Sequence, residues 1–238
     1  MNHLILLFRS SLFFIGFLLV TLVFGLFSPL MFLLPYQSRY FVMTRWATVI
    51  TWWLKVSCNL SYQVTGLENI PQQPIVILSK HQSTFETIVF QCIFPPFTWI
   101  MKRELLWLPF FGWGLATFRP ITINRAKGVQ ALKHIFKQGT QRLESGLSVL
   151  VFPEGTRSRW GDKNAYRTGG VALAKQAGVA ILPVAHNAGK FWAKGQFVKQ
   201  SGVVKIHIGA TIATNKEDVR TLNKITEAWI ETTVAQLD

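Results

Sequence analysis

The chain has 238 residues, of which 50% are hydrophobic and only 15% are charged, and its formal net charge is +14. This length fits one domain with an appendage, and the low charged fraction argues against a purely soluble protein. The positive charge favours nucleic acid, anionic lipid or an acidic protein as a partner, without choosing among them. The two cysteines, Cys58 and Cys92, provide neither a disulfide framework nor the spacing of a metal site.

A long apolar run near the N-terminus, residues 10–38, contains no charged side chain. A helix that crosses a bilayer needs about 20 apolar residues, and this run is longer. The apolar core of a signal peptide is usually about 7–15 residues, and no clear A-x-A cleavage site follows this run. The run therefore predicts a membrane helix, which Pro29 kinks or ends.

A second apolar stretch, residues 46–64, is interrupted by Lys55. Its neighbouring side chains Trp52 and Trp53 suit the interface between a membrane and water. Two arrangements fit: the two stretches cross the membrane as a helical hairpin, or both dip into one leaflet and lie partly in the interface. The basic residues that follow position 38 favour the cytoplasmic side for the rest of the chain.

The remaining sequence, residues 66–238, alternates short apolar runs with amphipathic stretches, whereas residues 1–65 are expected to form the membrane-associated helices. Strands that alternate with helices indicate an α/β domain, in which helices flank a mostly parallel sheet. The periodicity predicts strands at residues 74–79, 97–101, 147–152, 179–185 and 203–209, and helices at residues 83–94, 127–146, 171–178 and 216–237.

Two polar stretches follow expected strands directly, "SKHQSTFE" at residues 79–86 and "PEGTRSR" at residues 153–159. In a sheet of this type, ligands bind where loops leave the carboxyl ends of the strands. The shared position of the two stretches predicts one functional site between them.

His81 and Glu86 in the first stretch have two interpretations. A histidine can take a proton from a hydroxyl group, and a carboxylate on its far ring nitrogen would fix the tautomer and stabilise the imidazolium. This requires His81 on the loop and Glu86 on the first turn of the following helix. Alternatively, Ser83 and Glu86 form a capping box, in which Glu86 satisfies a free backbone N–H. The capping box leaves His81 unexplained.

The second stretch offers groups that suit a phosphate. Gly155 allows the backbone to approach a ligand closely, Thr156 offers a hydroxyl, and Arg157 offers a bidentate fork. Glu154 either anchors the loop or binds substrate hydroxyls. The alternative is a solvated basic loop with an internal pair between Glu154 and Arg157.

Lys102 and Arg125 follow other apolar segments and would add positive charge to the same pocket if their strands neighbour the first. Motifs of other enzyme classes are missing from the sequence: there is no G-x-S-x-G and no Walker A, G-x-G-x-x-G or H-E-x-x-H. The scattered histidines His3, His134, His186 and His207 are interpreted as non-catalytic, and no metal site is expected.

Taken together, the motifs resemble those of the PlsC-type family of 1-acyl-sn-glycerol-3-phosphate (lysophosphatidic acid) acyltransferases. The first family motif, a histidine followed after four residues by an acid, corresponds to His81 and Glu86. Arg125 in "ITINR" matches the second block, "FPEGTRS" matches the third in full, and Pro183 in "AILPVA" matches the fourth. The order and spacing agree over residues 75–185.

The sequence departs from the family pattern at three positions. The family acid is usually Asp, whereas this chain has Glu86. Lys80 replaces the usual Asn before the histidine, and Asn124 replaces the acid before Arg125. These departures could mark a subfamily with another acceptor, such as a lyso-ornithine lipid or a lysophospholipid.

The resemblance implies the glycerolipid acyltransferase fold and transfer of an acyl chain to lysophosphatidate, giving phosphatidate in phospholipid biosynthesis. The donor would be acyl-CoA or acyl-carrier protein as a co-substrate, with no other cofactor, no metal and no nucleic acid. His81 would be the general base and Glu86 its orienting partner. The residues expected to bind the substrate are Lys102, Arg125, Glu154, Gly155, Thr156 and Arg157.

A rival interpretation is a non-catalytic basic protein that is tethered to a membrane and holds anionic lipid or nucleic acid. It explains the charge but leaves His81 and the "FPEGTRS" loop without a role. The resemblance favours an enzyme at the inner (cytoplasmic) membrane, with its catalytic domain on the cytoplasmic face.

Overall fold

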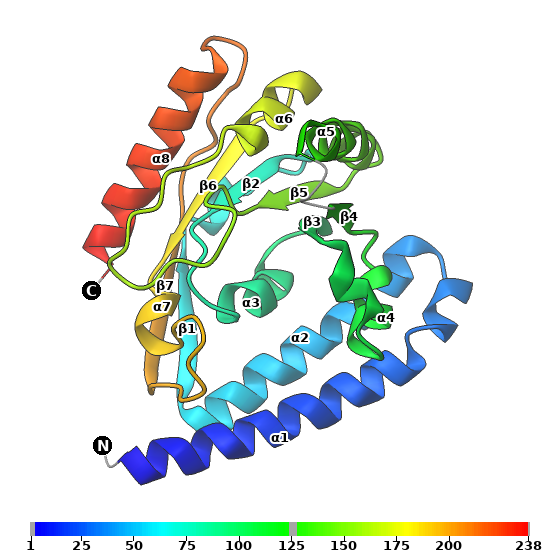
Figure 1. Cartoon of the computed structure of the whole chain (residues 1–238), viewed down its shortest axis with the longest axis vertical. Coiled ribbons are helices and arrows are strands. Elements are labelled where there is room, and N and C mark those ends of the chain that lie inside the picture. Colours follow the sequence, from blue (N-terminus) through cyan, green and yellow to red (C-terminus); the bar gives the residue numbers. More distant parts are fainter. Residues whose placement is uncertain (1–2, 124–127, 238) are drawn as a thin grey trace.

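A computed structural model describes residues 3–123 and 128–237. Its described strands form one seven-stranded sheet in the order β1-β7-β6-β2-β5-β3-β4 (Figure 1). Every neighbouring pair is parallel except β6 and β7, so the expected mostly parallel sheet is confirmed. The strands are β1 (Leu60–Thr65), β2 (Val76–Ser79), β3 (Phe97–Lys102), β4 (Ile121–Ile123), β5 (Ser148–Val151), β6 (Ile181–His186) and β7 (Gly202–Ile208).

Helices cover both faces of the sheet, and each face has its own hydrophobic core. One face carries α1 (His3–Phe27), α2 (Tyr36–Cys58), α3 (Phe85–Ile93) and α4 (Phe111–Ala116), and the other carries α5 (Gly128–Glu144), α6 (Gly169–Ala177) and α8 (Val219–Gln236). The short helix α7 (Ala188–Phe191) follows β6, and the 3₁₀ turns are η1 (Leu30–Leu33), η2 (Leu67–Asn69) and η3 (Arg103–Trp107).

The N-terminal helices α1 and α2 pack against each other as a hairpin joined by η1. Within the described residues, α1 is the one helix long and apolar enough to cross a membrane, judged by length and composition. It ends at Phe27, two residues before Pro29, as the sequence predicts. A hydrogen bond joins the two helices: Nε1–H of Trp53 on α2 donates to the carbonyl of Phe13 on α1 at 3.2 Å. Trp53 is thus partly buried between the helices, whereas the predicted interfacial position fits Trp52, which is 61% exposed.

The second apolar stretch does not form one helix to residue 64. Asn59 takes a left-handed conformation (φ 50°) and ends α2, and the chain turns directly into β1. β1 pairs in parallel with β7 along its whole length. This strand lies before the expected boundary at residue 65, although it is hydrogen-bonded into the sheet. The apolar character of residues 60–64 reflects a strand that is half buried.

The other expected elements are present. The predicted strands are β2, β3, β5, β6 and β7, and the predicted helices are α3, α5, α6 and α8. β2 and β5 are direct neighbours, with Leu78 opposite Val151. The loops that leave their carboxyl ends therefore start side by side, at the edge where the sequence placed the functional site.

Candidate active site

The two polar loops are joined through the backbone of His81. Its N–H donates to Oε1 of Glu154 at 2.9 Å, and its carbonyl accepts the N–H of Ser158 at 2.8 Å and the hydroxyl of Ser158 at 3.2 Å. Both partners belong to the loop after β5. The ring of His81 also stacks on Phe152, with the ring centroids 3.9 Å apart and the planes 14° from parallel. These contacts hold the imidazole at the carboxyl edge of the sheet.

Glu86 makes the contacts that both interpretations of the sequence require. Its Oε1 atom lies 2.9 Å from Nδ1 of His81 and also accepts the N–H groups of Gln82 and Ser83, at 2.9 and 2.8 Å. The hydroxyl of Ser83 accepts the N–H of Phe85, the first residue of α3, at 3.1 Å. One carboxylate oxygen thus caps the start of α3 and contacts the histidine.

The environment keeps Glu86 ionised. Burial of this carboxyl would raise its pKa, but the imidazoles of His186 and His81 and the N–H of Ser83 hold the pKa below its usual value. Facing a carboxylate, Nδ1 of His81 must carry the proton, because the carboxylate can only accept. Nε2 of His81 is then the basic nitrogen, and the side chain is 16% exposed, so a substrate hydroxyl can approach it.

His186 hydrogen-bonds the backbone of the loop that carries His81. It is fully buried; its Nε2–H donates to the carbonyl of Lys80 at 2.8 Å, and its Nδ1 accepts the N–H of Ala188 at 3.3 Å. This arrangement requires the neutral ring, and burial lowers the pKa of His186 below its usual value. His186 therefore fixes the backbone next to His81 and has no free nitrogen for a substrate.

The "FPEGTRS" loop brings Arg157 beside the histidine loop. Nη1 of Arg157 donates to Oγ1 of Thr84 at 2.9 Å, within the segment between His81 and Glu86. The turn that allows this passes through Gly155 at φ +72°, a conformation that L side chains rarely adopt. Thr156 is exposed beside it, and its hydroxyl accepts from Nζ of Lys194 at 3.5 Å.

Glu154 does not face the solvent as a substrate ligand would. Its side chain is fully buried, accepts the N–H of His81 and pairs with Nζ of Lys80 at 3.4 Å. These contacts match the interpretation in which Glu154 anchors the loop, since its carboxylate joins the two polar loops. Substrate binding by Glu154 stays a prediction.

A buried charge cluster around Lys80 escaped the sequence analysis. Nζ of Lys80 lies 2.7 Å from Oε1 of Glu231 on α8 and 3.2 Å from the carbonyl of Asp162, in addition to Glu154. Tyr166 donates its hydroxyl to the same Oε1 of Glu231 at 2.8 Å. Burial and the neighbouring Glu231 raise the pKa of Tyr166. Lys80 replaces a neutral family residue, and that departure was the available signal that an acidic partner is needed.

The remaining predicted phosphate ligands are not brought to His81 by any described contact. Lys102 is exposed at the end of β3, where it pairs with Ile123 through the sheet, and its side chain makes no hydrogen bond or ion pair within the described residues. Arg125 lies outside the described residues, as do Asn124 and Lys127. Across residues 3–123 and 128–237, no group of three or more His, Cys, Asp or Glu side chains could hold a metal ion.

The arrangement can activate a hydroxyl group. Nε2 of His81 can accept its proton, Glu86 can stabilise the resulting imidazolium, and the guanidinium of Arg157 on the adjoining loop suits an anionic group carried by the same molecule. This is the chemistry of group transfer to an alcohol that lies close to a phosphate or carboxylate.

Comparison with known proteins shows the family of the chain and relatives of its fold. A family model described as Acyltransferase matches residues 61–187. A 1-acyl-sn-glycerol-3-phosphate acyltransferase of Pseudomonas aeruginosa is 44% identical over 209 residues, covering 86% of this chain and 81% of the relative. One of Borreliella burgdorferi is 30% identical over 171 residues, covering 71% and 67%. The crystal structure of the LPA acyltransferase PlsC from Thermotoga maritima has the same fold, with a TM-score of 0.82 at 22% identity over 96% of this chain and 94% of that one.

Proposed function

The chain belongs to the acyltransferase family, and on that premise we propose that it acylates the sn-2 hydroxyl of 1-acyl-sn-glycerol-3-phosphate to give phosphatidic acid. The observation that carries the proposal is the contact between His81 and Glu86 beside the loop of Arg157. The relatives named above support the choice of acceptor, because the chain covers 81% of the Pseudomonas protein's length.

His81 acts as the general base. The acceptor oxygen attacks the thioester carbonyl carbon while its proton passes to Nε2 of His81. The tetrahedral intermediate then collapses by breaking the carbon–sulfur bond, and the proton moves from Nε2 to the departing sulfur, giving the ester and a thiol. Glu86 keeps the reactive tautomer and stabilises the imidazolium between these steps. General base catalysis of this kind contributes roughly 10²–10⁴-fold.

Arg157 binds the phosphate of the acceptor. Its Nη1 group donates a hydrogen bond to Oγ1 of Thr84, which holds the guanidinium against the loop that carries His81. The other N–H groups of the guanidinium make no hydrogen bond within the described residues. The exposed hydroxyl of Thr156 adds a donor on the same loop. The N–H of Gly155 donates to the carbonyl of Phe152 at 3.0 Å, so Gly155 contributes the close approach of the backbone that its missing side chain allows. Lys102 and Arg125 are proposed as further phosphate contacts that form when the lysolipid is bound.

The donor is an acyl thioester, acyl-CoA or acyl-carrier protein, and no further cofactor takes part. The donor's energy-rich carbon–sulfur bond drives the reaction, and an alcohol, a base and an anion site are sufficient for the transfer. The formal charge of +14 favours phosphate-bearing and acidic donors alike.

The N-terminal helices hold the enzyme at a membrane. Large apolar side chains are exposed along α1, including Leu4 at 69% and Phe8 at 68%, and Leu33 on η1 is 83% exposed. An apolar surface of this kind is stable against lipid. We place the α/β domain on the cytoplasmic face, where a lysolipid can enter the site with its chain still in the bilayer.

The test is a product analysis. Purified protein is supplied with several lysolipids and with either acyl-CoA or acyl-carrier protein, and the products are identified by mass spectrometry. The proposal predicts phosphatidic acid from lysophosphatidate. Acylation of another lysolipid, with lysophosphatidate left unreacted, would overturn the assignment of the acceptor.

A further inference from the structure

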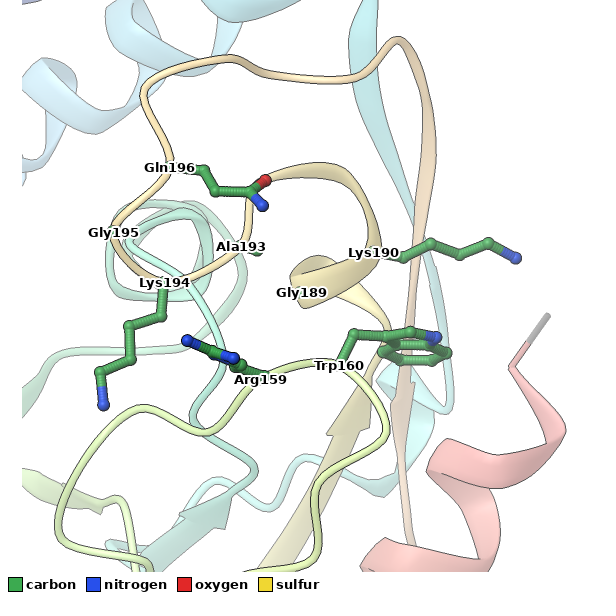
Figure 2. Close-up of a pocket in the computed structure, with 8 residues that line it drawn as sticks. All are labelled: Arg159, Trp160, Gly189, Lys190, Ala193, Lys194, Gly195 and Gln196. Atoms are coloured by element: carbon green, nitrogen blue, oxygen red, sulfur yellow. The ribbon is translucent and has the colours of Figure 1, made fainter.

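A second pocket lies beside the active-site loops, between the loop after β5 and the segment after β6. Its volume is about 630 Å³, and Figure 2 shows its lining residues. Arg159 and Trp160 come from the first segment, and α7 with the turn behind it supplies the rest. The lining consists of Arg159, Trp160, Gly189, Lys190, Ala193, Lys194, Gly195 and Gln196.

The pocket is positively charged. Arg159, Lys190 and Lys194 are exposed, none of the three makes an ion pair within the described residues, and the lining contains no acidic side chain. The carboxylate of Asp162 accepts the backbone N–H of Arg159 at 3.2 Å, and the guanidinium of Arg159 makes no ion pair with any described residue. Three cations in one concave site form a binding site for a molecule with several anionic groups.

The pocket also contains a flat aromatic surface. The indole of Trp160 is partly exposed. In Figure 2, Trp160 and Lys190 are seen on one side of Gly189, with the Lys190 side chain extending outward, and Arg159 and Lys194 are seen on the other side. Aromatic side chains of this kind stack with nucleobases, whatever the base. The site therefore offers a stacking surface and separate cationic groups, a combination that suits a nucleotide.

Direct contacts join the pocket to the catalytic loops. The N–H of Gly189 donates to Oε1 of Gln82, the residue after His81, at 3.3 Å. A side chain at Gly189 would clash, because an added Cβ would lie 2.9 Å from Cβ of Gln82. On the other rim, Lys194 donates to the hydroxyl of Thr156, next to Arg157. A ligand in this pocket would thus border the catalytic site.

We propose that this pocket binds the nucleotide end of coenzyme A when acyl-CoA is the donor, an inference that rests on the proposed function. The phosphate groups of the nucleotide contact Arg159, Lys190 and Lys194, and the adenine stacks on Trp160. The thioester arm then extends past Gln82 toward His81. A phospholipid headgroup lacks the aromatic base, and an acidic carrier protein would need a broad surface, so a half-open pocket of about 630 Å³ with an aromatic side chain in its lining favours the nucleotide.

The test compares two doubly substituted proteins that lose the same charge. One carries Arg159→Gln with Lys190→Gln in the pocket. The control carries Lys133→Gln with Lys137→Gln, two exposed residues of α5. The pocket variant should raise the KM for acyl-CoA roughly tenfold or more, because charge-assisted hydrogen bonds are lost, and should change the KM for the lysolipid less than about twofold. The control should retain the wild-type KM for both substrates.

Trp160→Phe gives an independent measurement by calorimetric titration with coenzyme A itself. Phenylalanine keeps the aromatic ring but reduces its area, so weaker binding is expected, and Trp160→Ala should weaken it further. The affinity of the wild type should fall with added salt, since the contacts are ionic.

Each other outcome has a defined meaning. A wild-type protein that forms no phosphatidic acid refutes the proposed function itself. A wild type that is active with acyl-CoA, together with an unchanged KM in the pocket variant, refutes this inference alone. Use of acyl-carrier protein only, or a loss confined to that donor, assigns the pocket to a protein and overturns the inference. Weaker binding to anionic vesicles with an unchanged KM for acyl-CoA assigns it to lipid and also overturns it.

Discussion

Nδ1 of His81 and Oε1 of Glu86 lie 2.9 Å apart, and the same oxygen also accepts two backbone N–H groups at the start of α3. The orienting carboxylate is therefore fixed by the helix that it caps. The longer side chain of glutamate, compared with the usual aspartate, reaches both the loop histidine and the helix start.

The charge of Glu86 should matter for catalysis more than for folding. Glu86→Gln keeps a side-chain oxygen for the backbone N–H groups but cannot stabilise an imidazolium. We expect kcat to fall roughly 10²–10⁴-fold, with the folded structure retained in circular dichroism. The measurement is the initial rate at saturating substrates.

Ser83→Ala is the matched control for the cap. It removes the acceptor of the Phe85 N–H and should cost about 0.5–2 kcal/mol of stability, with kcat close to that of the wild type. If Glu86→Gln instead loses stability and keeps its rate, Glu86 is a capping residue alone.

Arg157 should discriminate acceptors by their phosphate. Arg157→Gln should raise the KM for lysophosphatidate roughly tenfold or more, because a charge-assisted contact is lost. It should affect an uncharged monoacylglycerol little. Arg220→Gln, at an exposed position on α8, controls for the loss of a positive charge. An equal loss for both acceptors would mean that Arg157 holds the loop without binding phosphate.

The Lys80 cluster should contribute to stability as a unit. Lys80→Met leaves the carboxylate of Glu154 buried without its counter-charge, and removing one partner of a buried ion pair costs about 3–5 kcal/mol. Adding Glu231→Gln to Lys80→Met should recover part of this loss, because the second carboxylate is then neutral. Chemical denaturation in detergent measures both. Strictly additive losses would contradict a direct interaction between Lys80 and Glu231.

Stability should fall as the pH decreases below the usual histidine pKa of 6.5. The folded chain keeps His186 neutral with a lowered pKa, so the unfolded chain binds the extra proton first and is favoured as the pH falls. The slope for one group reaches at most about 1.4 kcal/mol per pH unit. Glu86, whose pKa is also lowered, adds a separate loss at more acidic pH, below its usual value of 4.5.

Thermal unfolding between about pH 7.5 and 5.5 tests this dependence. His186→Gln should flatten the curve in this range, because glutamine does not titrate. His207→Gln, which changes a histidine on β7 that is not fully buried, should leave the slope as in the wild type. A wild-type curve without slope would contradict a buried neutral His186.

Local rules predicted where the two polar loops lie. Strand patterns located β2 and β5, and the parallel-sheet rule placed their loops together, so His81, Glu86 and Arg157 could be named before the structure was known. The two interpretations of Glu86 could not be separated, because both depend on the same spacing and the structure contains both.

Long-range partners were beyond the reach of sequence patterns. Lys80 and Glu231 are 151 positions apart, and no periodicity links them. The burial of Glu154 was not predicted either, because a loop carboxylate gives no sign in the sequence of what covers it. β1 was hidden in an apolar stretch, since hydropathy alone does not mark the turn at Asn59.

The base role of His81 is tested most directly by the turnover of His81→Ala with lysophosphatidate and an acyl thioester at saturation. The account predicts a kcat lowered about 10²-fold or more, with the lysolipid still bound at near wild-type affinity through Arg157. A variant that turns over at the wild-type rate would show that another group removes the proton, and the proposed mechanism would be wrong.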